Sequence, residues 1–286
     1  MPIFLSYDRT RISYDLRGEG EPLVVLAGGP GMDARYLGGL GGLDRRRRLV
    51  LLDARATGRS DVPADRATVS FVEQARDVEA LRRHLGLDRL DLLAHSAGCL
   101  TAQEYRAEHP DRVRRTVLVA PVGRAGREPD QAELTALRAA RAGESWYPDA
   151  AEADRLLAAG GHTDAELAAL QRLIVPFFWH RWTEERRAEY RPEHATTLDW
   201  LRDAFYAGSA RPDTLAGRIA RLAAPASPLL VLAGASDGMI GTAPARAVAD
   251  CHPGGRLEML ARSGHRPWVE EPERFVGVVE EFLAAR

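Results

Sequence analysis

The stretch LDLLAHSAGC, residues 90–99, decides the fold of this chain. A short apolar run ends at Ser96, and a helix-forming segment follows it. This is the pattern of a nucleophile elbow, in which a serine stands at the tip of a strained strand-to-helix turn. Such a turn needs small residues two positions to either side of the serine, and here these are Ala94 and Gly98. The first position departs from G-x-S-x-G by one methyl group, so the rest of the chain must supply the context.

Apolar runs like the one before Ser96 recur along the chain. Continuous runs of this length are typical of parallel strands that are buried on both faces. Between them lie helical patterns, of which 71–85 and 275–282 are the clearest. Two short strands, 4–7 and 12–16, predict an antiparallel pair at the start. The alternation predicts an α/β fold with a mostly parallel central sheet flanked by helices; its strands are expected at 23–27, 49–52, 90–94, 116–120, 229–233 and 256–260.

The alternation stops between about 122 and 225. This segment is rich in Ala, Arg and Glu, and it favours helices at 131–141 and 164–173 without any convincing strand. It also holds four of the five tryptophans, so it should pack a small core of its own, roof an apolar pocket, or do both. We therefore predict a helical cap at 122–225, inserted into a catalytic core formed by 1–121 and 226–286.

Composition excludes several classes of protein. A formal net charge of −2 gives no reason to expect nucleic acid or an anionic membrane as a partner, and the arginine run at 45–48 is interpreted as a solvated turn before a strand. The two cysteines, Cys99 and Cys251, make neither a disulfide framework nor a metal cluster. No signal peptide and no membrane-spanning apolar stretch is seen, so a cytoplasmic protein without metal or cofactor is expected.

A serine hydroxyl becomes a nucleophile only when an oriented base takes its proton. In a fold of this kind the acid and the histidine should follow Ser96 in that order, each after a late strand. Asp237 follows the run 229–233, and His265 follows the run 256–260. We therefore predict a triad of Ser96, Asp237 and His265, with Asp213 as the weaker rival for the acid. The other seven histidines, His95 included, are interpreted as structural or surface residues.

An oxyanion hole requires two backbone N–H groups directed at the developing negative charge. One is expected from Ala97, directly after the nucleophile. The other is expected from the glycine-rich loop 28–31, where the backbone can approach a substrate closely. Gly29 is favoured as the second donor, and Gly28 is its rival.

Four stretches give the chain a resemblance to α/β-hydrolases of the proline iminopeptidase-like group, which carry a helical cap. They are GGPG at 28–31, DARATGRS at 53–60, HSAG at 95–98 and SGHRPW at 263–268. The resemblance implies the α/β-hydrolase fold and a serine-hydrolase activity, and it implies a structural role for Asp53 and Arg55. Two positions depart from the group's pattern: Ala27 stands where it has a histidine, and Ala56 where it has a glycine.

The group's iminopeptidases bind the free amine of the substrate through glutamates of the cap, often paired with a tryptophan. The resemblance therefore suggests Trp182, Glu184, Glu185 and Glu193 as substrate-binding residues, although none of them aligns residue by residue. On this interpretation the chain cleaves an N-terminal aminoacyl or prolyl amide of a small molecule or short peptide.

Two alternatives stay open. An esterase or lactonase for an apolar metabolite is favoured by the aromatic cap. A small-molecule-binding protein that has kept the fold without its chemistry would usually show a broken triad, and here none of its residues is missing. The serine at the elbow disfavours enzymes with an acidic nucleophile, such as dehalogenases and epoxide hydrolases. The sequence leaves the oligomeric state undetermined.

Overall fold

Eight strands form one sheet in the computed structural model, which describes residues 2–123, 128–189, 198–207, 217, 219 and 227–285. Their spatial order is β1-β2-β4-β3-β5-β6-β7-β8. The first two strands and β4 pair antiparallel, and the remaining pairs are parallel, as the apolar runs predict. The bounds are β1 Ile3–Leu5, β2 Arg11–Arg17, β3 Pro22–Leu26, β4 Arg48–Leu52, β5 Leu90–His95, β6 Val113–Val119, β7 Leu229–Gly234 and β8 Gly255–Leu260.

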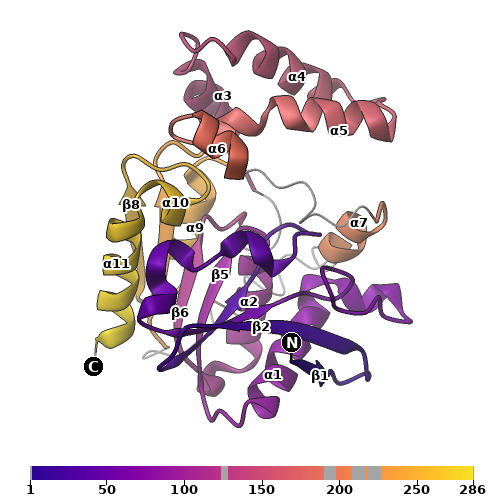
Figure 1. Ribbon diagram of the computed structural model, residues 1–286, viewed down its shortest axis with the longest axis vertical. Coiled ribbons are helices and arrows are strands. Elements are labelled where there is room, and N and C mark those ends of the chain that lie inside the picture. Colours follow the sequence, from indigo (N-terminus) through magenta and orange to yellow (C-terminus); the bar gives the residue numbers. More distant parts are fainter. Residues whose placement is uncertain are drawn as a thin grey trace.

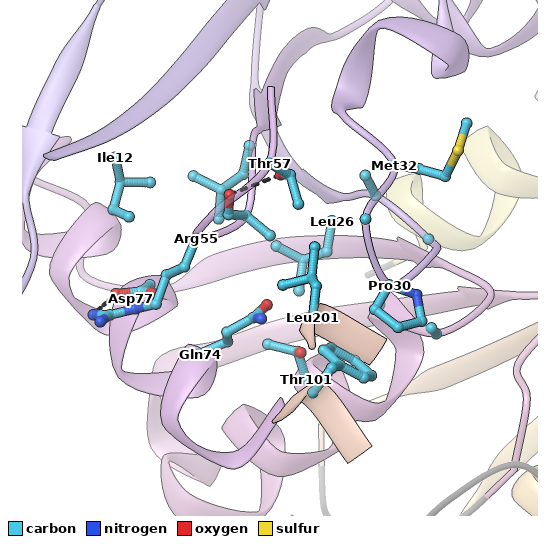
Figure 2. Close-up of a pocket in the computed structure, with 18 residues that line it drawn as sticks. Ile12, Leu26, Pro30, Met32, Arg55, Thr57, Gln74, Asp77, Thr101 and Leu201 are labelled. Carbon is cyan, nitrogen blue, oxygen red and sulfur yellow. Dashed lines mark hydrogen bonds and ion pairs between the residues drawn. The ribbon is translucent and has the colours of Figure 1, made fainter. Parts of the chain in front are cut away.

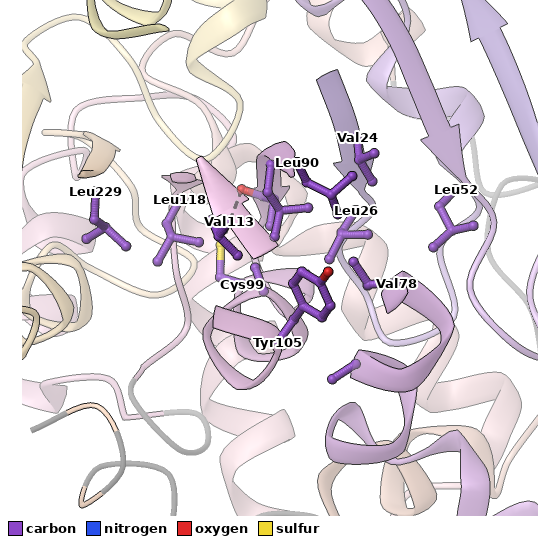
Figure 3. Packing of buried hydrophobic residues seen from close by; sticks show 14 of the residues in the cluster. Val24, Leu26, Leu52, Val78, Leu90, Cys99, Tyr105, Val113, Leu118 and Leu229 are labelled. Atoms are coloured by element: carbon purple, nitrogen blue, oxygen red, sulfur yellow. Dashed lines mark hydrogen bonds between the residues drawn. The ribbon is translucent and has the colours of Figure 1, made fainter. Parts of the chain in front are cut away.

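Both faces of the sheet are covered by helices. Alternate residues of each strand point to opposite faces, so Val24 and Val25 of β3 belong to two different apolar cores. Figure 3 shows the first core, where Cys99 and Tyr105 of α2 and Val78 of α1 pack against the strands. The helices around the sheet are α1 Phe71–His84, α2 Gly98–Glu108, α9 Ala243–Cys251, α10 Pro267–Glu270 and α11 Pro272–Ala284, with 3-10 turns η1 Ala34–Leu37, η2 Leu40–Arg45, η3 Arg66–Val69 and η4 Pro110–Arg112.

The arginine run before β4 is less solvated than the sequence suggests. The side chain of Arg47 is buried, and its Nε donates a hydrogen bond to Glu280 of α11 over 2.8 Å. The other three arginines are exposed or form the strand's first residue. The run therefore includes one ion pair that ties the start of β4 to the C-terminal helix.

Between β6 and β7 the described residues form helices and no strand. Figure 1 shows α3, α4, α5 and α6 gathered together at one end of the molecule, beyond the sheet. The helices predicted at 131–141 and 164–173 correspond to α3 and α5. The bounds of the whole set are α3 Gln131–Ala139, α4 Tyr147–Ala159, α5 Asp164–Leu173, η5 Val175–Phe178, α6 Glu184–Glu189 and α7 Leu201–Tyr206. We call this helical segment the insertion.

A small aromatic core holds part of the insertion together. The ring of Phe177 packs edge-on against Trp146 and Tyr147, at centroid distances of 5.4 and 6.1 Å. A carboxylate then joins the insertion to the sheet domain: Glu133 of α3 accepts the backbone N–H groups of Thr242 and Ala243 over 2.8 and 2.9 Å. These donors lie at the start of α9, where an acidic group satisfies free N–H groups and the helix dipole.

None of the helices that the structure describes is both long and apolar enough to cross a membrane.

Candidate active site

Ser96 lies at a sharp turn between β5 and α2. Its φ of 54° falls in the left-handed region, which costs energy for any residue with a Cβ. The turn is held by a backbone hydrogen bond from Ser96 to Val119 of the neighbouring strand, 2.9 Å long. A Cβ at Gly98 would overlap the carbonyl oxygen of Ala27, which is why a glycine is needed two residues after the serine. The elbow predicted from the sequence is thus present in the backbone.

His265 joins Ser96 to Asp237 through one continuous set of hydrogen bonds. Its Nε2 lies 3.0 Å from Ser96 Oγ, and its Nδ1 lies 2.7 Å from Asp237 Oδ2. Because a carboxylate only accepts, Nδ1 carries the proton and Nε2 is left to accept from the serine. All three side chains are buried. The rival acid, Asp213, lies outside the described residues.

The carboxylate of Asp237 is itself fixed in place. Its second oxygen, Oδ1, accepts the backbone N–H groups of Met239 and Ile240 over 2.9 and 3.2 Å. The loops that carry the acid and the histidine also pack directly against each other, since a Cβ at Gly234 would overlap the backbone of Ser263 and Gly264. This arrangement leaves little freedom in the distance between the two side chains.

The glycine-rich loop after β3 passes next to Ser96. The N–H of Gly28 donates to the hydroxyl of Tyr36 over 2.7 Å and is therefore occupied. The N–H groups of Gly29 and Ala97, by contrast, have no acceptor in the part of the chain that the structure describes. Of the two donors considered in this loop, Gly29 is the one left available.

A strap formed by residues 177–181 of the insertion lies across both catalytic loops. The carbonyl of Phe177 accepts from Gly238, and that of Phe178 accepts from His265 itself, over 3.0 and 2.6 Å. His180 Nδ1 lies 2.8 Å from the hydroxyl of Ser236, one residue before the acid. The strap thus contacts the neighbourhood of Asp237 and the backbone of His265.

Glu270 binds the strap to the loop of His265. Its carboxylate accepts the N–H of His180 over 2.9 Å, that of Arg181 over 3.2 Å and that of Gly264 over 2.7 Å. The sequence does not predict this role, because an acidic residue near a helix start is an ordinary feature. The only available signal was its position, five residues after His265.

Three of the four residues predicted to bind an amine lie in the part of the chain that the structure describes, and no described contact joins them to the triad. The side chains of Glu184 and Glu185 are 87% and 77% exposed and pair with Arg187 and Arg186 of the same helix, α6. Trp182 lines a separate hollow within the insertion, between α4, α5 and α6. Glu193 lies outside the described residues. No described contact therefore supports an amine site made by this set.

A narrow cavity opens beside the glycine-rich loop and Ala97 (Figure 2). Thr101 and Leu201 line it near Pro30, and Arg55 and Asp77 lie at its other end. Its free space is about 30 Å³, which admits one water-sized group. The Arg55–Asp77 ion pair is buried, in agreement with a structural role for Arg55.

Among the described residues, no group of three or more His, Cys, Asp or Glu side chains is placed to hold a metal ion.

Comparison with known proteins places this geometry in a family. The chain belongs to the alpha/beta hydrolase fold family, whose model matches residues 21–272. It is 26% identical to a proline iminopeptidase from Heyndrickxia coagulans, over 98% of this chain and 97% of that protein. It is 29% identical to a 2-hydroxymuconate semialdehyde hydrolase from Pseudomonas putida, over 94% of this chain and 89% of that protein.

Among solved structures, an esterase from Exiguobacterium antarcticum superposes with a TM-score of 0.70 at 19% identity, covering 99% of both chains. This likeness shows the fold alone. The fold and the resemblance predicted from the motifs are both confirmed, and the protein is an α/β-hydrolase enzyme.

Proposed function

We propose that this enzyme is a serine hydrolase that works through an acyl-enzyme, with Ser96 as nucleophile, His265 as general base and Asp237 as its orienting acid. The observation that carries the proposal is the buried hydrogen-bond chain from Asp237 through His265 to Ser96, with lengths of 2.7 and 3.0 Å. These lengths are within the reach that proton transfer requires.

In the proposed reaction Ser96 Oγ attacks a carbonyl carbon while its proton passes to His265 Nε2. Asp237 stabilises the imidazolium that forms, and the N–H groups of Gly29 and Ala97 bind the oxyanion. The imidazolium then gives its proton to the leaving group as the bond between that group and the carbonyl carbon breaks, and the acyl-enzyme remains. A water molecule, deprotonated by His265, attacks the acyl carbonyl. The bond from the acyl carbon to Ser96 Oγ then breaks, Oγ takes the proton back from His265, and the acid product leaves.

The first candidate bond is an N-terminal aminoacyl or prolyl amide, in a small molecule or a short peptide. The relative named as a proline iminopeptidase, which matches nearly the whole chain, supports it. A substrate ammonium that leaves water for an aromatic-lined pocket needs a carboxylate partner, because an unpaired buried charge costs several kcal/mol. Of the predicted partners, Glu184 and Glu185 face solvent, so Glu193 is the one to test first.

The second candidate is an ester or lactone of an apolar metabolite. It is supported by the exposure of Glu184 and Glu185 and by the aromatic side chains of the insertion. An ester substrate needs no charged anchor, so the solvent exposure of Glu184 and Glu185 would not weaken its binding.

A fluorophosphonate probe tests the mechanism independently of the substrate. It should label the wild-type protein and leave Ser96→Ala unlabelled, since only an activated serine reacts. A wild-type protein that resists labelling would contradict the mechanism and favour a non-catalytic binding protein.

The bond is then decided with three compounds: prolyl p-nitroanilide, its N-acetyl twin and p-nitrophenyl acetate. An aminopeptidase should prefer the free-amine substrate. Glu193→Gln should lower the activity on that substrate alone by about ten- to a hundredfold, as expected for the loss of one charge-assisted hydrogen bond. Glu184→Gln and Glu185→Gln are matched controls. A wild-type preference for the acetylated amide or the ester would instead favour the esterase.

A further inference from the structure

His95, the residue before the nucleophile, joins two parts of the active site through a second hydrogen-bond chain. The N–H of Gly28 donates to the Tyr36 hydroxyl, 2.7 Å away, and that hydroxyl lies 2.6 Å from His95 Nδ1. On the other side of the ring, His95 Nε2 lies 3.0 Å from the backbone carbonyl of His265. This hydrogen-bond chain therefore runs from the glycine-rich loop, through η1 and the end of β5, to the backbone of the proposed general base.

The chemistry of the groups fixes every proton in this chain. A carbonyl can only accept, so His95 Nε2 must carry a hydrogen and donate a hydrogen bond to the backbone carbonyl of His265. The Tyr36 oxygen already accepts from Gly28, so its own hydrogen is free to go to His95 Nδ1. An imidazolium would place a hydrogen on Nδ1 as well, facing the tyrosine hydroxyl. The arrangement is complete only when His95 is neutral.

The surroundings keep both side chains in that state. His95 is 3% exposed, and the indole of Trp268 packs edge-on against its ring with centroids 4.8 Å apart. Burial, and after it the charge that His265 can carry, hold the pKa of His95 well below its usual value. Burial also raises the pKa of Tyr36, which stays protonated.

The residues around Gly28 leave no room for a further side-chain atom. A Cβ placed on Gly28 would lie 2.9 Å from Ser96 Cβ, 3.0 Å from His95 Nδ1 and 3.0 Å from the Tyr36 hydroxyl. The peptide before Gly29 is thus held against the nucleophile on one side and fixed by the tyrosine on the other. Any shift of Tyr36 would move this loop.

We propose that Tyr36 and His95 are positioning residues, which set the Gly29 N–H of the oxyanion hole at a fixed place relative to His265. This inference rests on the proposed serine-hydrolase function. Neither side chain transfers a proton in it. Their effect is exerted through the backbone of Gly28 on one side and the backbone of His265 on the other.

A thionoester substrate distinguishes this role from a purely structural one. Sulfur is larger than oxygen and accepts hydrogen bonds poorly, so a well-placed oxyanion hole favours the oxygen ester. A misplaced oxyanion hole loses that preference. A general loss of stability lowers the activity on both substrates and leaves the ratio of oxygen-ester to thionoester activity unchanged. The measurement compares p-nitrophenyl acetate with its thionoester, per active site titrated with fluorophosphonate.

In Tyr36→Phe, we expect kcat on the oxygen ester to fall about 10- to 100-fold while KM changes less than about threefold. The ester-to-thionoester ratio should fall by at least about fivefold for the same reason. His95→Asn tests the chain from its other end and should give the same pattern. Tyr14→Phe is the matched control, because Tyr14 makes a hydrogen bond of the same kind to His84 at 3.1 Å, on a different histidine.

Two outcomes would overturn the inference while the wild type stays active. One is a kcat in Tyr36→Phe and His95→Asn within about twofold of wild type; the other is a lower kcat with an unchanged ratio, which would leave only a structural role. A wild-type protein that neither labels nor turns over would remove the proposed function itself, and this inference with it.

Discussion

The backbone N–H of His265 donates to the carbonyl of Phe178 over 2.6 Å, so the proposed general base is bound to the insertion as well as to the sheet domain. The side chain of Glu270 adds to this attachment, because it accepts N–H groups from both the strap and the loop of His265.

Replacing Glu270 with Gln should lower kcat about tenfold, because an amide group turned toward several N–H donors cannot accept from all of them and the loop shifts. The melting temperature should fall as well, since the part-buried N–H groups of His180 and Gly264 lose their acceptor. Glu273→Gln is the control: it removes the same charge three residues later, on the exposed side of α11. Equal kcat values for the two variants would show that the strap does not position His265.

Removing the members of the triad should reduce kcat without unfolding the protein. For Ser96→Ala and His265→Ala we expect a loss of roughly four to six orders of magnitude, because the three residues act as a unit. Asp237→Asn should cost on the order of 10⁴, since the amide favours the wrong imidazole tautomer. Steady-state kinetics beside thermal melting checks both statements. Appreciable turnover by pure Ser96→Ala would contradict the assignment.

Adding one methyl group at Gly28 should impair catalysis through contacts alone. The new Cβ would press on Ser96, His95 and Tyr36, so we expect Gly28→Ala to lose at least about tenfold in kcat. Gly277→Ala provides the contrast, because its Cβ meets nothing within 4 Å in α11. That control should stabilise the protein by about 0.5–1 kcal/mol, the usual gain of alanine over glycine in a helix. Full activity of Gly28→Ala would show that the loop has room to move.

Stability should fall as the pH is lowered below about 6.5, the usual pKa of histidine. Burial, with a contribution from the charge of Arg106, lowers the pKa of His252 to about 3 in the folded protein. The unfolded chain therefore binds a proton that the folded chain does not. His252 alone should account for about 2 kcal/mol of unfolding free energy lost between about pH 7 and pH 5.

Urea unfolding at the two pH values measures this loss. In His252→Asn the loss should be smaller by that amount, while His95 and the other histidines contribute equally to both proteins. An identical pH dependence in the two proteins would show that His252 is already charged, or exposed, in the folded state.

The sheet and the order of the catalytic residues along the chain could be predicted because both depend on short stretches of sequence. Each apolar run is a strand, and Asp237 and His265 each follow one, so the ends of parallel strands bring them to Ser96. The role of Tyr36 could not be predicted in this way. Tyr36 lies in a 3-10 turn that no sequence periodicity predicts, and its hydroxyl contacts a histidine 59 positions further along the chain.

The predicted amine site shows a second limit of the sequence. Glu184 and Glu185 lie amid aromatic residues in the sequence, but the turn of α6 directs their side chains to solvent. Closeness along the chain says little about the direction of a side chain on a short helix. Glu270, a far better connected carboxylate, lies among ordinary acidic residues near a helix start.

Because residue 178 holds the loop of His265 through its carbonyl oxygen, the half-buried side chain of Phe178 can change while that backbone contact is kept. The ring of Phe177 is not free in this way, since it packs against Trp146 and Tyr147. Spacing is not free in the same way. Deleting one residue between Phe177 and Arg181 would turn carbonyls away from Gly238 and His265, whatever side chains were kept. Libraries that vary Phe178 at constant length should therefore mostly yield active protein, and libraries that vary the length of the strap should mostly yield inactive protein.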